Sequence, residues 1–173
     1  MSELSAADIR GLLAALNLEL GQADASAEVY VLGGAVMCLV FATRPATRDV
    51  DAYFLPANKV REAARRVALA HELPDNWLND AAKGYMSDRA EFSPFLDLPH
   101  LKVLTATPEY LLAMKCLAMR LGAEFHDAAD VRFLLRYLNL TSIKEVETIL
   151  AKYYPIERFP PKTFFALEGM LTE

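Results

Sequence analysis

The chain has 173 residues, of which 54% are hydrophobic and 24% charged, and its formal net charge is −5 at pH 7. This apolar content excludes an intrinsically disordered protein and predicts one folded domain or two small lobes. The negative charge excludes broad, sequence-independent binding to nucleic acid, which needs a basic face, and leaves room for a local basic patch.

The N-terminal half of the chain alternates helical and extended patterns. Ser5 with Asp8 three residues later predicts a capping box that opens a helix over 6–20. Apolar spacing and turn residues then predict, in chain order, a strand over 28–32, a buried helix over 35–43, a strand over 49–55, a helix over 57–72, a short helix or irregular segment over 73–85, and strands over 91–97 and 101–105.

The C-terminal half is predicted to be helical. Thr107 followed by Pro108 is typical of an N-cap with proline at the first helical position, and it opens a helix that ends near residue 121. Further helices are predicted over 124–138, 142–153 and 161–171. This order predicts an α+β fold with a small mixed sheet, in which an α/β core over 1–106 carries a packed helical lobe over 107–173.

Nothing in the sequence predicts a membrane or secreted protein. The N-terminal segment carries acidic residues and no apolar stretch of the kind found in signal peptides. The longest apolar run, over 35–42, is too short to cross a bilayer. Cys38 and Cys116 both stand in apolar segments, as buried structural thiols do. We therefore expect a cytoplasmic protein with no membrane contact.

Two glycines and two carboxylates mark the predicted turn and strand around residue 50. Gly33 and Gly34 end the first strand, and Asp49 and Asp51 open the second. Alternation along a strand puts both carboxylates on one face, roughly 6–7 Å apart. Mg²⁺ is often held by one or two carboxylates and completed by substrate phosphates, and glycines let a phosphate approach the backbone. The pattern indicates a nucleotide–metal site, the alternative being a solvated strand face beside an ordinary turn.

The segment "VLGGAVMCLVFATRPATRDVDAYF" resembles the signature of the DNA-polymerase-β-type nucleotidyltransferase superfamily. Its Arg-x-x-Thr-Arg-Asp-x-Asp form, with the helical "LLAMK" and a later acidic helix, is similar to the minimal bacterial nucleotidyltransferases, which include abortive-infection and toxin–antitoxin enzymes. The resemblance covers roughly residues 28–138. It implies a nucleotidyltransferase-type sheet, Mg²⁺ as cofactor, an NTP as substrate, an acceptor that is RNA or protein, and a cognate antitoxin as a partner.

The resemblance also implies roles for the residues of the signature. Gly33 and Gly34 would form the phosphate-binding turn, and Asp49 and Asp51 would hold Mg²⁺. The spacer between the glycines and the carboxylates is longer than the commonest form. Many members carry a third carboxylate on a later strand, and Asp97 is the acid near a suitable run here, although Leu98-Pro99 follows it.

Toxin-type members place a lysine on one helix and an aspartate on the next, as Lys115 does here with Asp127 or Asp130. Lys115 is predicted to lie on an apolar helix face, so its ammonium group needs an anion or a path to water. The anion is either an NTP phosphate or a carboxylate of the protein. Asp127 and Asp130 lie in the first turn of their predicted helix, where acids also suit the helix dipole.

Three more residues are candidates for nucleotide contacts. Arg44 and Arg48 flank the Asp pair. They would bind the triphosphate or a nucleic-acid acceptor, or they would only neutralise Asp49 and Asp51. Asn79 would line a base pocket or cap a turn.

The sequence therefore predicts a Mg²⁺-dependent nucleotidyltransferase that moves an NMP from an NTP to an acceptor hydroxyl. The catalytic candidates are Asp49, Asp51, Lys115 and Asp130. The alternative is a non-catalytic, binding or antitoxin-like module of the same fold, because no clear third carboxylate is present.

Overall fold

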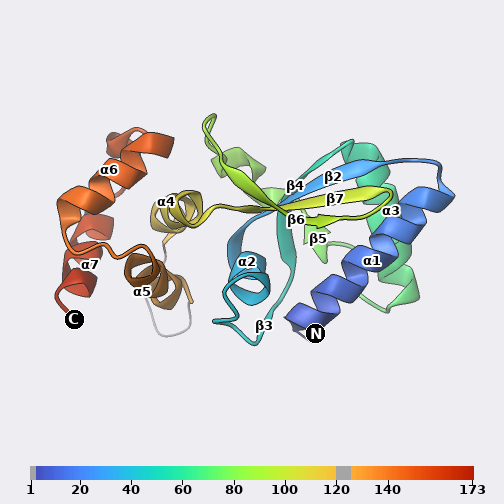
Figure 1. The fold of residues 1–173 in the computed structure, drawn as a ribbon, viewed down its shortest axis with the longest axis horizontal. Helices are drawn as coiled ribbons and strands as arrows, with labels where there is room; N and C mark the ends of the chain where they lie inside the picture. The colour runs from blue at the N-terminus through green and yellow to red at the C-terminus, as the bar shows by residue number, and fades with distance from the viewer. Residues whose placement is uncertain (1–2, 120–125) are drawn as a thin grey trace. The chain divides into compact units, whose positions relative to one another are not determined.

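The computed structural model describes residues 3–119 and 126–173, and it divides the chain into two compact units (Figure 1). The sheet unit comprises Met1–Gly84 and Phe92–Ala106. The helical unit comprises Tyr85–Glu91 and Thr107–Glu173. The chain therefore passes between the units three times.

The sheet unit is built on a mixed five-stranded sheet in the order β5-β4-β2-β7-β6. Strand β2 pairs antiparallel with β4 and parallel with β7, β5 is parallel to β4, and β6 is antiparallel to β7. The five strands are β2 (Ala27–Val31), β4 (Val50–Leu55), β5 (Leu78–Asn79), β6 (Phe92–Asp97) and β7 (Leu101–Ala106). Together with the helices below, this sheet confirms the predicted α+β class with a mixed sheet.

The helices of the sheet unit are α1 (Ala6–Gln22), α2 (Gly33–Leu39) and α3 (Ala57–Ala70), and a 3-10 helix, η1 (Ala81–Tyr85), follows β5. Two short strands, β1 (Leu4–Ser5) and β3 (Ala46–Thr47), pair with each other. The predicted capping box is confirmed, because Ser5 Oγ accepts from Asp8 N at 3.1 Å and Asp8 Oδ2 accepts from Ser5 N at 2.9 Å. The predicted helix over 35–43 is too long: α2 ends at Leu39, and Ala42 then takes a left-handed φ of 54°.

One face of the five-stranded sheet is apolar and packs against α1 and α3. Val29, Ala52 and Phe54 are buried there, and the Arg61 guanidinium group of α3 lies 5.7 Å from the centre of the Phe54 ring. Alternate residues point to the opposite face, where side chains remain partly exposed. We call this the open face, and its residues include Glu28, Tyr30, Asp51, Tyr53, Leu55, Phe92, Lys102 and Leu104.

The helical unit contains α4 (Pro108–Ala118), α5 (Asp127–Tyr137), α6 (Ile143–Tyr153), a 3-10 helix (Ile156–Arg158) and α7 (Pro161–Leu171). The predicted helix end near 121 and helix start at 124 lie outside the described residues. Thr107 caps α4 as predicted, accepting from Tyr110 N. Within residues 3–119 and 126–173, no helix is long and apolar enough to cross a membrane.

Tyrosine hydroxyls bind the segment 85–91 to the helical unit. Tyr154 donates to the carbonyl oxygen of Tyr85 at 2.6 Å, and Tyr153 donates to a Glu91 carboxylate oxygen at 3.0 Å. Burial, followed by the Glu91 bond, raises the pKa of Tyr153 to about 12. These hydroxyls therefore stay protonated and keep donating throughout the neutral range.

Candidate functional site

The glycine turn after β2 meets the first residues of β4. The antiparallel pairing brings the two segments together, and Leu32 N donates to the Asp51 carbonyl oxygen at 2.8 Å. Gly33 has a left-handed φ of 62°, and a Cβ atom added to it would lie 3.1 Å from Asp51 Oδ2. Glycine is required here for its backbone conformation, and the close carboxylate leaves little room for a side chain.

Gly33→Ala tests this requirement. We expect the variant to lose about 1–2 kcal/mol of unfolding free energy, because an L-residue is strained in the left-handed region. Chemical denaturation of the two proteins measures the difference. Gly84→Ala is the matched control, since a Cβ atom there meets nothing within 4 Å and Gly84 has no positive φ. Equal losses in the two variants would contradict this account of Gly33.

Arg44 lies against the second glycine of the turn. A Cβ atom on Gly34 would come within 2.5 Å of Arg44 Nη1 and 3.1 Å of Thr47 Oγ1. The guanidinium group therefore approaches the first turn of α2 in space that only glycine leaves open. Because α2 has seven residues and a correspondingly small dipole, the full positive charge of Arg44 outweighs that dipole at this turn.

Asp49 is half-buried beside β5. Asn79 Nδ2 donates to Asp49 Oδ2 at 3.3 Å, and the parallel pairing sets Asn79 level with Asp51. Burial raises the pKa of Asp49, and the Asn79 bond and the positive charge of Arg48 lower it by less. Because the pKa of this half-buried carboxylate is raised, an additional cation beside it would stabilise its charged form.

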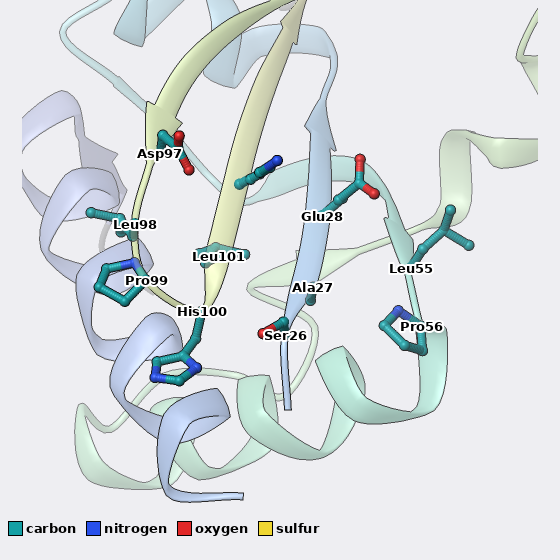
Figure 2. Close-up of a pocket in the computed structure, with 11 residues that line it drawn as sticks. Ser26, Ala27, Glu28, Leu55, Pro56, Asp97, Leu98, Pro99, His100 and Leu101 are labelled. Carbon is teal, nitrogen blue, oxygen red and sulfur yellow. The ribbon is translucent and has the colours of Figure 1, made fainter. Parts of the chain in front are cut away.

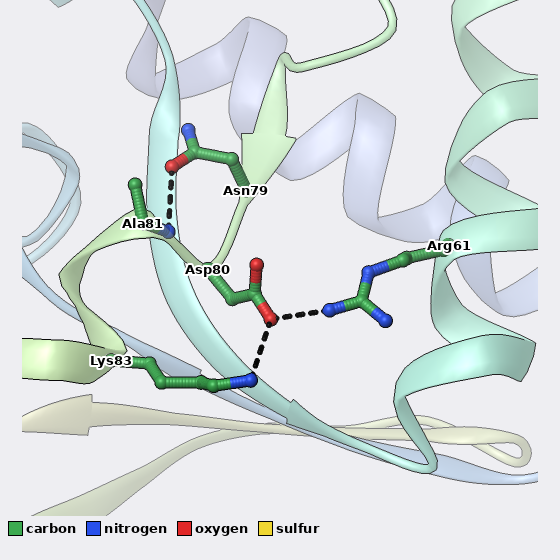
Figure 3. A network of polar contacts seen from close by, with 5 residues as sticks. All are labelled: Arg61, Asn79, Asp80, Ala81 and Lys83. Carbon is green, nitrogen blue, oxygen red and sulfur yellow. Dashed lines mark hydrogen bonds and ion pairs between the residues drawn. The ribbon is translucent and has the colours of Figure 1, made fainter.

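Asn79 also caps a turn, which is the second of the two roles that the sequence predicts for it. Its Oδ1 accepts from Ala81 N at 3.2 Å (Figure 3). The next residue, Asp80, contacts Arg61 Nη2 of α3 at 2.6 Å and Lys83 Nζ at 3.7 Å. These exposed pairs add little stability individually, but they link the turn that carries Asn79 to α3.

The raised pKa of Asp49 predicts that Asp49→Asn stabilises the metal-free protein at neutral pH. Above its raised pKa the folded protein carries a penalised charge, which the amide removes. We expect the melting temperature to rise by roughly 1–3 °C, a small effect because solvent screens this half-exposed group. The gain should shrink as pH falls through the raised pKa and vanish below about pH 4, where aspartate protonates in the unfolded chain too. Melting curves across this range without Mg²⁺ measure it, and a gain that grows on acidification would contradict it.

Asp97 is not brought to the Asp49–Asp51 site. The strand register sets Ala106 of β7 level with Asp51 and pairs Asp97 with Lys102, four residues and roughly 13 Å further along. Phe92, the β6 partner of Ala106, carries no carboxylate either. Strands β6 and β7 therefore supply no third carboxylate at the level of Asp51. Asp97 instead lines a hollow at the opposite end of the sheet (Figure 2).

The helical unit brings Lys115, Asp127 and Asp130 together. Lys115 Nζ lies 2.7 Å from Asp130 Oδ2 and 3.9 Å from Asp127 Oδ1. The side chains of Lys115 and Asp130 are 10% and 4% exposed, so this is a buried ion pair between α4 and α5. Both aspartates lie in the first turn of α5, as predicted. The anion that Lys115 needs is thus supplied by carboxylates of the protein, and a contact with an NTP stays a prediction.

Three aromatic rings lie on the open face near Asp51. The ring centres of Tyr30 and Tyr53 are 6.1 Å apart, and those of Tyr30 and Phe92 are 5.0 Å apart. We call these three residues the aromatic row. The alternation of β4 indicates that Tyr53 shares a face with Asp51, but Tyr30 and Phe92 join it only through strand pairing, which the sequence analysis did not predict.

Asp49 directly precedes β4, of which Asp51 is the second residue, and two carboxylates at this spacing are a donor set that suits Mg²⁺ when a substrate completes its shell. Among the described residues, no three His, Cys, Asp or Glu side chains form a group that could hold a metal ion. A Mg²⁺ ion at Asp49 and Asp51 would therefore complete its shell with water and phosphate oxygens, as Mg²⁺ commonly does. Hard carboxylate oxygens, one of them on a group with a raised pKa, fit this ion.

Comparisons with models of protein families, with curated proteins and with solved structures return no match.

Proposed function

We propose that the protein is a Mg²⁺-dependent nucleotidyltransferase that transfers an NMP from an NTP to an acceptor hydroxyl. The observation that carries the proposal is that the left-handed Gly33 lies against the Asp51 carboxylate, so that a Cβ atom added to Gly33 would be 3.1 Å from Asp51 Oδ2. A phosphate that reached the backbone at this turn would lie beside the residues proposed to hold the metal. A solvated strand face needs no such glycine.

Asp49 and Asp51 would hold the ion. When bound, Mg²⁺ would neutralise phosphate charge and lower the pKa of an acceptor hydroxyl. Arg44, close to Gly34, would bind the phosphates through its planar guanidinium group. Arg48 is exposed and would contact the leaving phosphates or the acceptor.

The roles proposed for Lys115 and Asp130, which both belong to the helical unit, rest on the resemblance of the sequence. In this proposal Lys115 is a phosphate contact, and Asp130, at 2.7 Å, positions its ammonium group. Asp127, at 3.9 Å, would compensate the charge further.

The acceptor would be an RNA end or a protein hydroxyl, as in the enzymes that the signature resembles. A toxin–antitoxin setting, with a cognate antitoxin as partner, is part of the same proposal. The net charge of −5 favours a short or local contact with an acceptor over a long nucleic-acid track.

A second candidate function is a module that binds Mg²⁺–NTP without turnover. The specific observation is that β7 and β6 carry Ala106 and Phe92 at the level of Asp51. A transferase with a third carboxylate at this level could use it to deprotonate the acceptor, and neither residue can do so. This module would bind NTP with the same residues and release it unchanged.

Incubation with NTP labelled at the α-phosphate, Mg²⁺, total RNA and total protein distinguishes the two functions. The transferase labels an acceptor and releases pyrophosphate, and Asp49→Asn loses both products. Binding of NTP without labelling of any acceptor supports the binding module. Labelling that survives Asp49→Asn and Asp51→Asn would contradict the proposed site.

A further inference from the structure

The aromatic row lies beside the carboxylates on a surface that the core does not use. Tyr53 is two residues from Asp51 on the same face of β4, roughly 6–7 Å along the strand. Tyr30 is its direct partner on β2, and Phe92 contacts Tyr30 edge to face at 71°. Tyr30 and Phe92 stand on the two strands that flank β7, where Tyr30 pairs with Leu104 and Phe92 pairs with Ala106. The rings thus extend from β4 to β6.

The rings of the row are partly exposed. Tyr30, Tyr53 and Phe92 are each intermediate in exposure, whereas Val29, Ala52 and Phe54 on the other face are buried. Large aromatic side chains add most to stability when they are fully buried. Packing of the core therefore does not account for three of them on this face.

The setting of the row favours a flat, uncharged ligand. Glu28 and Asp51 flank it with carboxylates, and Lys102 lies opposite Glu28, so the row does not lie on the basic track that a long polyanion needs. Glu28 Oε2 accepts from the Tyr30 hydroxyl at 2.6 Å, which fixes the orientation of that ring. A π-face with a fixed orientation suits the stacking of a single base.

We propose that the base of the NTP stacks on the aromatic row, with Tyr53 as the main contact and Tyr30 as its support. The inference rests on the proposed function, because phosphates held at Gly33, Asp49 and Asp51 put the ribose and base next to Tyr53. Stacking tolerates every base, so the row supplies affinity for nucleotides as a class.

The test compares Mg²⁺–ATP with Mg²⁺–tripolyphosphate, which has the phosphates and lacks the base. Calorimetry measures both ligands on the wild type, Tyr53→Ala, Tyr53→Phe and Tyr137→Ala. Tyr137 is the matched control, an exposed tyrosine of the helical unit. We expect Tyr53→Ala to weaken Mg²⁺–ATP binding by roughly 5- to 100-fold and to leave tripolyphosphate binding unchanged. Tyr53→Phe and Tyr137→Ala should bind both ligands as the wild type does.

The outcomes separate the inference from the proposed function. If the wild type binds Mg²⁺–ATP and Tyr53→Ala binds it equally well, the stacking inference is overturned and the proposed function stands. Equal weakening for ATP and tripolyphosphate would also overturn it, because the ring would then support only the phosphate site. A wild type that binds no NTP overturns both. Tyr53→Leu, which keeps apolar volume without a π-face, gives the same comparison if the alanine variant does not fold.

Discussion

Asp51→Asn is expected to lower the rate of nucleotidyl transfer by at least roughly 100-fold, the scale on which loss of a single electrostatic contact acts. The Asp51 carboxylate is the group that faces the Gly33 turn, so its charge is proposed to hold Mg²⁺ where the phosphates arrive. The amide keeps the shape of the side chain and loses its charge. Initial rates at saturating NTP and Mg²⁺ measure the change.

Two carboxylate variants serve as controls for this prediction. Asp75→Asn removes an exposed charge between α3 and β5 and should leave the rate unchanged. Asp97→Asn should also leave it unchanged, because Asp97 pairs with Lys102, roughly 13 Å from the level of Asp51. A rate loss in Asp97→Asn equal to that in Asp51→Asn would contradict the placement of the site.

Lys115→Ala is expected to lower the free energy of unfolding by about 3–5 kcal/mol, the usual effect of removing one partner of a buried ion pair. Asp130, 4% exposed, and Asp127 would both lose the ammonium group that neutralises them. Denaturant unfolding followed by circular dichroism measures the loss.

The same unit offers a matched exposed pair, Arg132 and Glu173, at 2.7 Å with side chains 38% and 43% exposed. Arg132→Ala should lose no more than about 1 kcal/mol. The double variant Lys115→Ala/Asp130→Ala should lose less than the sum of its two single variants, because both single changes remove the same ion pair. Additive losses, or equal losses for Lys115→Ala and Arg132→Ala, would contradict the buried-pair account.

Local signals in the sequence predict most of the secondary structure. Capping residues act within a few positions, so Ser5 and Thr107 predict the starts of α1 and α4 correctly. Alternation acts over a single strand, and it predicts that Ala52 is buried while Asp51 and Tyr53 share the opposite face. These signals need no knowledge of the partner strands.

Features that depend on distant contacts were not predictable in this way. The two-residue strand β5 is extended because it pairs with β4, and its own residues form part of a turn. The segment 85–91 joins the helical unit through hydroxyls of Tyr153 and Tyr154, which lie more than sixty positions further along the chain.

The same distinction holds for the candidate site. The sequence puts Gly33 at the end of one strand and Asp51 at the start of the next, but their approach depends on the antiparallel pairing of β2 with β4. A strand–helix–strand order is also that of a parallel crossover, so it does not predict this pairing. The distance between Asp97 and Asp51 follows from the register of β6 and β7, which the sequence does not specify. The aromatic row is formed by the pairing of four strands, so no continuous stretch of sequence predicts it.

The most direct test of the central claim is calorimetry of the wild-type protein with ATP, GTP, CTP and UTP, each with and without Mg²⁺. The proposed site predicts binding that requires Mg²⁺ and is lost in Asp49→Asn/Asp51→Asn. Absence of binding for all four nucleotides, or binding that the double variant retains, would contradict a nucleotide–metal site at Gly33, Asp49 and Asp51.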